Sequence, residues 1–200
     1  YGPGTVAFTG RSTSLFVQDD WRARANLTLN LGLRYEFARS PIDSQNHAIY
    51  FDIPTGKFQY AGVDISRSVV NPDYNNFAPR VGFAWRPRFL SNTVIRGGVG
   101  TYYATDNFNE LQFLIAGSPF YTSLSNSPDP LHPVSITNPF GGTSTAFPPA
   151  NANIFTLYKN SRTPYVNQWD FSVQREFGGK YLVEVEYAGG SSQKLAQRYN

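Results

Sequence analysis

The residues best suited to chemistry in this sequence are two pairs of acids. Asp19 and Asp20 are adjacent, and because neighbouring residues of a strand point to opposite faces, they cannot form a catalytic dyad. Glu184 and Glu186 share a face and lie about 7 Å apart along a strand, a spacing that would suit a glycosidase. Ion pairs with basic residues elsewhere in the chain explain these glutamates more simply, the candidates being Arg34, Arg80 and Arg96.

Few residues in this sequence are suited to metal binding or to nucleophilic catalysis. His47 and His132 are isolated in expected loops, with no second histidine at a ligand spacing. The sequence contains no cysteine, which excludes a thiolate metal site, a cysteine nucleophile and a disulfide framework. No Ser/His/Asp arrangement has local support. We therefore expect a protein that is not an enzyme and that needs no metal or cofactor.

The net charge limits the partners that can be expected, and the hydropathy limits how the chain could cross a membrane. The 17 basic and 14 acidic residues give a net charge of +3, and no run of Lys or Arg is long enough to track a phosphate backbone. Nucleic acid is therefore not an expected partner. No apolar stretch approaches the roughly 18 residues of a transmembrane helix, so a membrane would have to be crossed with strands. Because the sequence starts at Tyr1 and contains no Met, we expect a piece of a longer product.

The strand pattern is clearest between Leu27 and Phe37. Apolar residues occupy every odd position of this segment and polar or small residues every even position, which is the period of a half-buried strand. Its eleven residues, tilted by about 45°, would rise on the order of 25 Å, which matches the apolar band of a membrane β-barrel. Strands of soluble proteins are usually about half as long.

Five further segments divide into one apolar face and one polar or small face, namely residues 12–21, 77–86, 93–103, 165–177 and 181–188. The connections alternate in length: three are short (22–26, 87–92 and 178–180) and two are long (38–76 and 104–164). Outer-membrane barrels have short periplasmic turns and long extracellular loops. We therefore predict an all-β fold, an antiparallel up-and-down segment of a transmembrane β-barrel with about six strands.

Aromatic residues gather near the ends of these strands. Those beside the short turns are Trp21, Trp85, Phe177 and Tyr181, and those beside the long loops are Tyr35, Phe37, Tyr103, Tyr165 and Tyr187. Strand preference explains the number of aromatic residues but not this placement. Two girdles at headgroup depth are the better interpretation.

The long loops carry signs of ordered structure. Residues 49–60 contain two short aromatic runs around Pro54-Thr55-Gly56, which predicts a hairpin that projects beyond the membrane. The 104–164 loop holds eight of the 14 prolines, so regular strand pairing is not expected there. Its apolar run, residues 111–116, is expected to pack on the loop itself.

With these segments laid out, the sequence resembles the barrels of TonB-dependent receptors. The resemblance is carried by residues 15–21 (LFVQDDW) and 27–36 (LTLNLGLRYE), which look like one hairpin of that family. Residues 76–85, 94–98 and 165–176 extend the resemblance, in particular to the Oar-like subgroup. It covers all six strands and little of the loops.

This resemblance implies a barrel of about 22 strands in the cell outer membrane, with an N-terminal plug in its lumen. Residues 1–200 would then be a partial barrel domain without the plug, since six strands are too few to close a barrel. The implied partners are outer-membrane lipid, the rest of the barrel, its plug and the TonB system. Gly97, Gly98 and Gly100 lie inside a strand, where close approach of the plug or of a neighbouring aromatic ring accounts for them.

The implied function is TonB-dependent uptake of a bulky extracellular ligand of unknown identity. Ligand capture would fall to the two long loops, with Asp106, Asn107 and Glu110 as candidate binding residues. One alternative is a structural or adhesive surface barrel that transports nothing. Another is a soluble carbohydrate-binding β module, which would have to bury each apolar face inside a sandwich.

Overall fold

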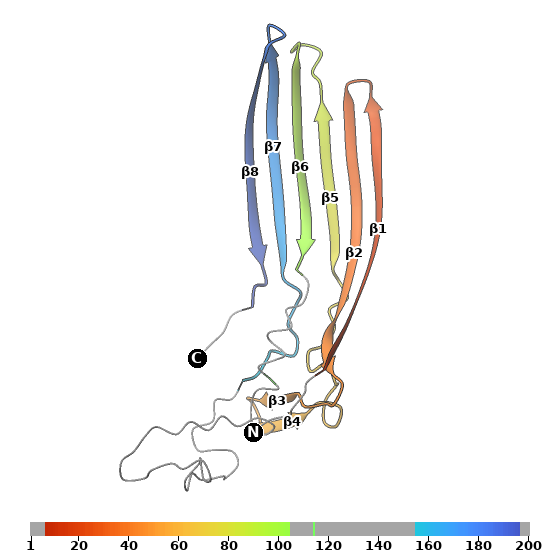
Figure 1. The fold of residues 1–200 in the computed structure, drawn as a ribbon, viewed down its shortest axis with the longest axis vertical. Coiled ribbons are helices and arrows are strands. Elements are labelled where there is room, and N and C mark those ends of the chain that lie inside the picture. Colours follow the sequence, from red (N-terminus) through yellow and green to blue (C-terminus); the bar gives the residue numbers. More distant parts are fainter. Residues whose placement is uncertain (1–6, 105–113, 115–154, 197–200) are drawn as a thin grey trace, which may run out of the picture. The chain divides into compact units, whose positions relative to one another are not determined.

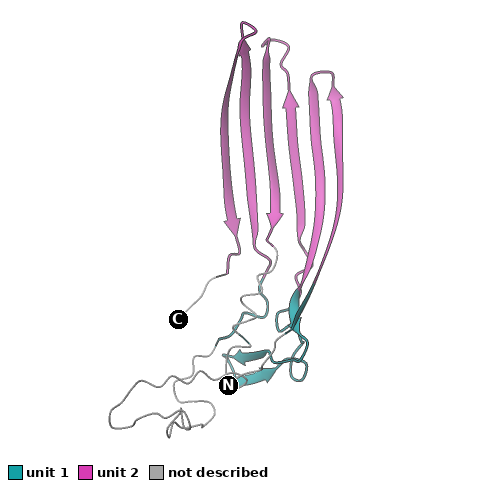
Figure 2. Ribbon diagram, in the orientation of Figure 1, with its two compact units in different colours: residues 1–10, 40–71, 107–161 teal, residues 11–39, 72–106, 162–200 magenta. Residues whose placement is uncertain are grey.

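The structure, a computed structural model, describes residues 7–104, 114 and 155–196. The chain divides into two compact units, shown in different colours in Figure 2. Unit 2 comprises residues 11–39, 72–106 and 162–200 and holds a sheet of long strands. Unit 1 comprises residues 1–10, 40–71 and 107–161 and holds a short hairpin. Within the described ranges, no helix is both long and apolar enough to cross a membrane.

Six long strands form one sheet in the described residues (Figure 1). They are β1 (Phe8–Arg24), β2 (Leu27–Asp43), β5 (Phe77–Trp85), β6 (Thr93–Tyr103), β7 (Tyr165–Phe177) and β8 (Tyr181–Gln193). Their order in the sheet follows the chain, and the pairs from β2 onward run antiparallel, so the predicted up-and-down arrangement is confirmed. In the sheet as described, β1 and β8 each have one neighbour, and the sheet is open.

Some strands extend beyond the ends that the sequence pattern predicts. β6 and β7 have the predicted bounds, whereas β2 runs on to Asp43 instead of ending at Phe37 and β8 runs on to Gln193 instead of Ala188. In these extensions the apolar alternation has stopped but the backbone still forms a strand. Main-chain hydrogen bonds do not depend on apolar side chains, so strands can continue where a hydrophobicity pattern no longer reports them.

The register gathers the apolar residues of different strands on one face of the sheet. One row across five strands consists of Leu31, Val81, Val99, Trp169 and Gly189. Val81 is 49% exposed and Val99 is 54% exposed, so the described structure leaves this face largely uncovered. A shift of one residue in any pairing would move its apolar residues to the opposite face, which is why the alternation fixes the register.

Unit 1 contains the hairpin predicted over residues 49–60. β3 (Ile49–Asp52) pairs antiparallel with β4 (Lys57–Tyr60), and Gly56 in the turn has a φ of +64°, a conformation that glycine adopts without strain. A small buried core lies around it, made of Ala48, Tyr50, Ala61, Val69 and Leu114. Leu114 comes from the second long loop and packs against residues of the first, so the prediction that residues 111–116 pack on their own loop is wrong for Leu114, the one residue of this run that the structure describes.

Candidate functional site

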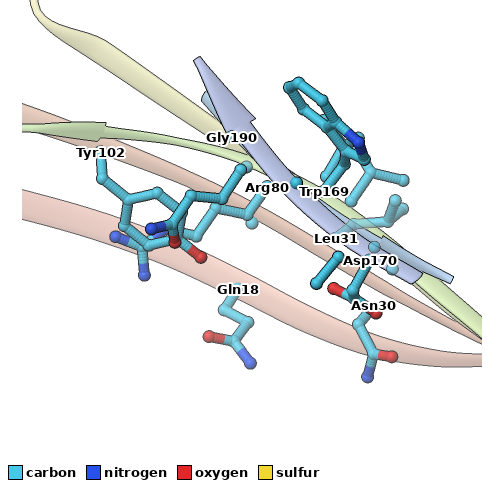
Figure 3. A pocket seen from close by; sticks show the side chains of 17 residues that line it. Gln18, Asn30, Leu31, Arg80, Tyr102, Trp169, Asp170 and Gly190 are labelled. Atoms are coloured by element: carbon cyan, nitrogen blue, oxygen red, sulfur yellow. The ribbon is translucent and has the colours of Figure 1, made fainter. Parts of the chain in front are cut away.

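The polar face of the sheet in unit 2 contains a recess whose lining residues come from all six strands of the sheet (Figure 3). Glycines make up much of its lining: Gly32, Gly82, Gly98, Gly100 and Gly190. The register brings them together, because Gly82 lies opposite Gly98, and Gly32 and Gly100 both lie opposite Arg80. Without side chains at these positions, the sheet surface is hollowed to a volume of about 670 Å³.

Charged and amide side chains surround the glycines that line the recess. The Arg80 guanidinium lies over the ring of Tyr102, 4.4 Å from the centroid, and Figure 3 shows the two side chains together. The carboxylate of Asp170 lies against Gly98, close enough that a Cβ there would be 3.0 Å from its Oδ1. In the part of the chain that the structure describes, neither Arg80 nor Asp170 forms an ion pair.

Two amides complete the polar surroundings of the recess. Asn30 donates from Nδ2 to Oδ1 of Asp20 at 2.6 Å, while Gln18 and Gln168 also line the recess. In Figure 3 Trp169 lies on the other side of the ribbon from Gln18 and Asn30. Along β7 it alternates with Gln168 and Asp170, whose side chains belong to the polar face. The recess thus presents one cation, one carboxylate and several amide groups to whatever occupies it, which equips it to recognise a polar ligand.

One member of each acid pair has a side-chain partner among the described residues. Asp20 accepts the hydrogen bond from Asn30, and Glu184 lies 4.0 Å from Nη1 of Arg96, one of the three arginines that the sequence suggested. The other two differ from the expectation, since Arg34 pairs with Glu36 and Arg80 stacks on Tyr102.

The remaining candidates from the sequence are placed as follows. His47 approaches Asp43, with 3.0 Å between Nδ1 and Oδ2, and the described residues contain no group of three potential metal ligands. Asp106, Asn107, Glu110 and His132 lie outside the described residues. Ligand binding by Asp106, Asn107 and Glu110 therefore stays a prediction.

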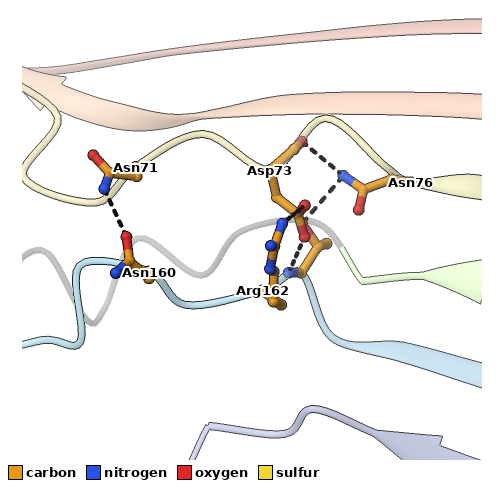
Figure 4. Close-up of polar contacts among 6 residues, drawn as sticks. Asn71, Asp73, Asn76, Asn160 and Arg162 are labelled. Carbon is orange, nitrogen blue, oxygen red and sulfur yellow. Dashed lines mark hydrogen bonds and ion pairs between the residues drawn. The ribbon is translucent and has the colours of Figure 1, made fainter.

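A buried aspartate in unit 2 links the segments that lead into β5 and β7 (Figure 4). Asp73 accepts hydrogen bonds from Nη1 of Arg162 at 2.8 Å and from the backbone N–H of Thr163 at 3.0 Å. Asn76 donates from Nδ2 to the backbone oxygen of Asp73 and to Oγ1 of Thr163, both at 3.2 Å. Burial alone would raise the pKa of Asp73, but the hydrogen bonds from Thr163 and Arg162 and the arginine charge together lower it.

A sheet with one exposed apolar face and one polar, hollowed face is the wall of a transmembrane β-barrel. In agreement, the model of the family described as "Outer membrane beta barrel domain" matches residues 1–200. The chain belongs to this family, and it is a protein of the cell outer membrane. Comparisons with curated proteins and with solved structures give no match. In this fold the apolar face meets lipid and the recess faces the lumen.

Proposed function

We propose that this chain is part of a TonB-dependent receptor that takes up a bulky ligand across the outer membrane. The observation that carries the proposal is the lumen-facing recess, in which Arg80 and Asp170 form no ion pair with a described residue. Arg80 and Asp170 are both exposed, so this recess offers a cation and a carboxylate to a polar ligand on the lumen side. The resemblance of residues 15–21 and 27–36 to TonB-dependent receptors supports the same function.

The contacts within the described part of unit 1 support a role of the long loops in ligand capture. Lys159 donates from Nζ to Oε1 of Gln59 at 2.6 Å and lies 4.1 Å from the ring centroid of Tyr50. Asn71 donates from Nδ2 to Oδ1 of Asn160 at 2.7 Å, which joins the two long loops within this unit. Ordered loops lose less conformational entropy on binding than flexible ones. In this proposal the loops bind the ligand, the lumen conducts it, and the protein catalyses no reaction.

The test compares uptake in cells that contain or lack the full-length protein, each with and without TonB. The probe is a pool of fluorescently labelled oligosaccharides and oligopeptides, scored for surface binding and for accumulation in the periplasm. We expect at least one pool member to accumulate only when both the protein and TonB are present. Surface binding that needs the protein, with no TonB-dependent accumulation of any pool member, would instead favour the adhesive or structural barrel.

A further inference from the structure

Basic residues gather at the short-turn end of β5 to β8, where Figure 1 shows the turns of these strands side by side. Arg86 and Arg88 belong to the connection between β5 and β6, Arg175 is near the end of β7, and Lys180 is in the turn before β8. We call these four residues the basic rim. No residue of the rim has a carboxylate partner within 4.0 Å in the described ranges.

Arg175 shows that the rim reaches the lipid-facing side of the sheet. It lies between Thr93 of β6 and Val183 of β8, in the alternation that also contains the apolar Val173. Its guanidinium carbon is 5.2 Å from the centroid of the Phe177 ring. The neighbouring acid Glu176 is on the opposite face by strand alternation. A cation on the lipid side therefore has an aromatic neighbour and no acid beside it.

Exposed aromatic rings surround the rim on the same side. The ring of Phe89 packs edge-on against Trp85, with 5.9 Å between centroids, and its residue is 75% exposed. Tyr181 is 71% exposed at the start of β8. Aromatic rings of this kind mark the depth of the lipid headgroups. At that depth a lipid-facing cation costs little, whereas at the bilayer midplane it would be strongly unfavourable.

We propose that the basic rim binds the phosphate groups of anionic phospholipids in the periplasmic leaflet of the outer membrane. Cations without acid partners, held at headgroup depth beside aromatic rings, are complementary in charge and position to such headgroups. The proposal rests on the barrel fold and on the short turns facing the periplasm. It does not depend on TonB-dependent uptake, because lipid binding at the rim needs neither the plug nor a transported ligand.

The test measures lipid selectivity of the full-length protein in phosphatidylcholine vesicles that contain either spin-labelled phosphatidylglycerol or spin-labelled phosphatidylcholine. We expect phosphatidylglycerol to associate with the protein several-fold more strongly, with each rim cation contributing up to about fivefold. The combined R86Q, R88Q, R175Q and K180Q variant, which removes all four rim cations, should bring the two lipids to near equality. The matched control is Arg96→Gln, which removes one cation from the polar face and should leave the preference unchanged.

Three outcomes decide the proposal. Equal association of the two lipids with the wild-type protein would overturn it. Arg175→Lys keeps the charge and should retain the preference, so a loss equal to that of Arg175→Gln, in folded protein, would show that packing rather than charge is involved and would also overturn it. Removal of the preference by inorganic phosphate, but not by sodium chloride of equal ionic strength, would assign the rim to free phosphate instead of a lipid.

Discussion

Two glycines on the lipid-facing side each lie beneath an aromatic ring of the neighbouring strand. A Cβ on Gly97 would come within 2.8 Å of Cε1 of Phe83, and a Cβ on Gly189 within 2.6 Å of Nε1 of Trp169. In both cases the ring belongs to the residue directly opposite in the register. The sequence interpretation that an aromatic ring approaches these glycines closely is confirmed for Gly97, and Gly189 follows the same arrangement.

Replacement of Gly189 by alanine should therefore destabilise the barrel. The new Cβ would force the Trp169 ring out of its position, at a cost of about 1–3 kcal/mol. The measurement is unfolding by urea in lipid vesicles, followed by tryptophan fluorescence. Gly32→Ala is the matched control, since the nearest atom to its added Cβ would be 3.7 Å away. Equal stability of the two variants would contradict the packing of Trp169 over Gly189.

Asp73 should make the junction before β5 and β7 sensitive to acid. Because its folded pKa is lowered below the unfolded value of about 3.9, its stabilising contribution is complete at neutral pH and is lost as the pH falls through the folded pKa. Hydrogen exchange of the Thr163 amide, corrected for the intrinsic pH dependence, should therefore lose protection below about pH 4. Asp73→Asn should lower this protection at neutral pH.

The control for this experiment is Asp64→Asn, which removes the charge of a carboxylate that accepts from the Tyr60 amide in unit 1 and should leave Thr163 unchanged. Protection of Thr163 that is the same in Asp73→Asn as in the wild type would show that the carboxylate does not hold this junction.

At the scale of the strands, the sequence predicted those features that depend on local alternation. The six long strands, their order along the chain and the 49–60 hairpin all follow from the period of two and from turn residues. The continuation of β8 past Ala188 was not predictable in this way. Gly189 and Gly190 interrupt the apolar pattern, and only the pairing of Gly189 with Trp169 shows why a strand continues there.

The sequence predicted neither the recess nor the Asp73 junction, because both depend on contacts between residues that are far apart in the sequence. The glycines that line the recess come from four strands, and they become neighbours only through the register of the sheet. Asp73 and Thr163 are ninety residues apart, and a single aspartate in a loop carries no motif. Of the chemistry-bearing pairs, the contact of Glu184 with Arg96 was anticipated, because both residues lie on the polar face of predictable strands.

Because one face of β2 meets lipid and the other faces the lumen, an arginine introduced at two adjacent positions of this strand should have very different effects on stability. Leu31→Arg places a cation near the middle of the lipid-facing side and should cost about 2–4 kcal/mol. Asn30→Arg places it on the polar face beside Asp20, where it should be tolerated. Heat-modifiable electrophoretic mobility of the protein in outer membranes measures assembly. Equal assembly of both variants would contradict the assignment of the faces.

At the scale of the whole molecule, the central claim is that the long sheet is a barrel wall with one face in lipid and the other toward an aqueous lumen. The family match and the exposed apolar row both support this claim. It accounts for features that would be unfavourable in a water-soluble protein, such as Leu15 at 67% exposure and Val185 at 69% exposure. The transport and lipid-binding proposals both rest on it.

The most direct test is a scan of single-cysteine variants along residues 27–37 of the full-length protein in lipid vesicles. None of residues 1–200 is a cysteine, so each variant introduces a single labelling site into this part of the protein. The account predicts that odd positions are accessible to oxygen, which dissolves in lipid, and that even positions are accessible to a water-soluble nickel chelate, with a period of two. Uniform accessibility to the nickel chelate along the segment would contradict a membrane-spanning wall.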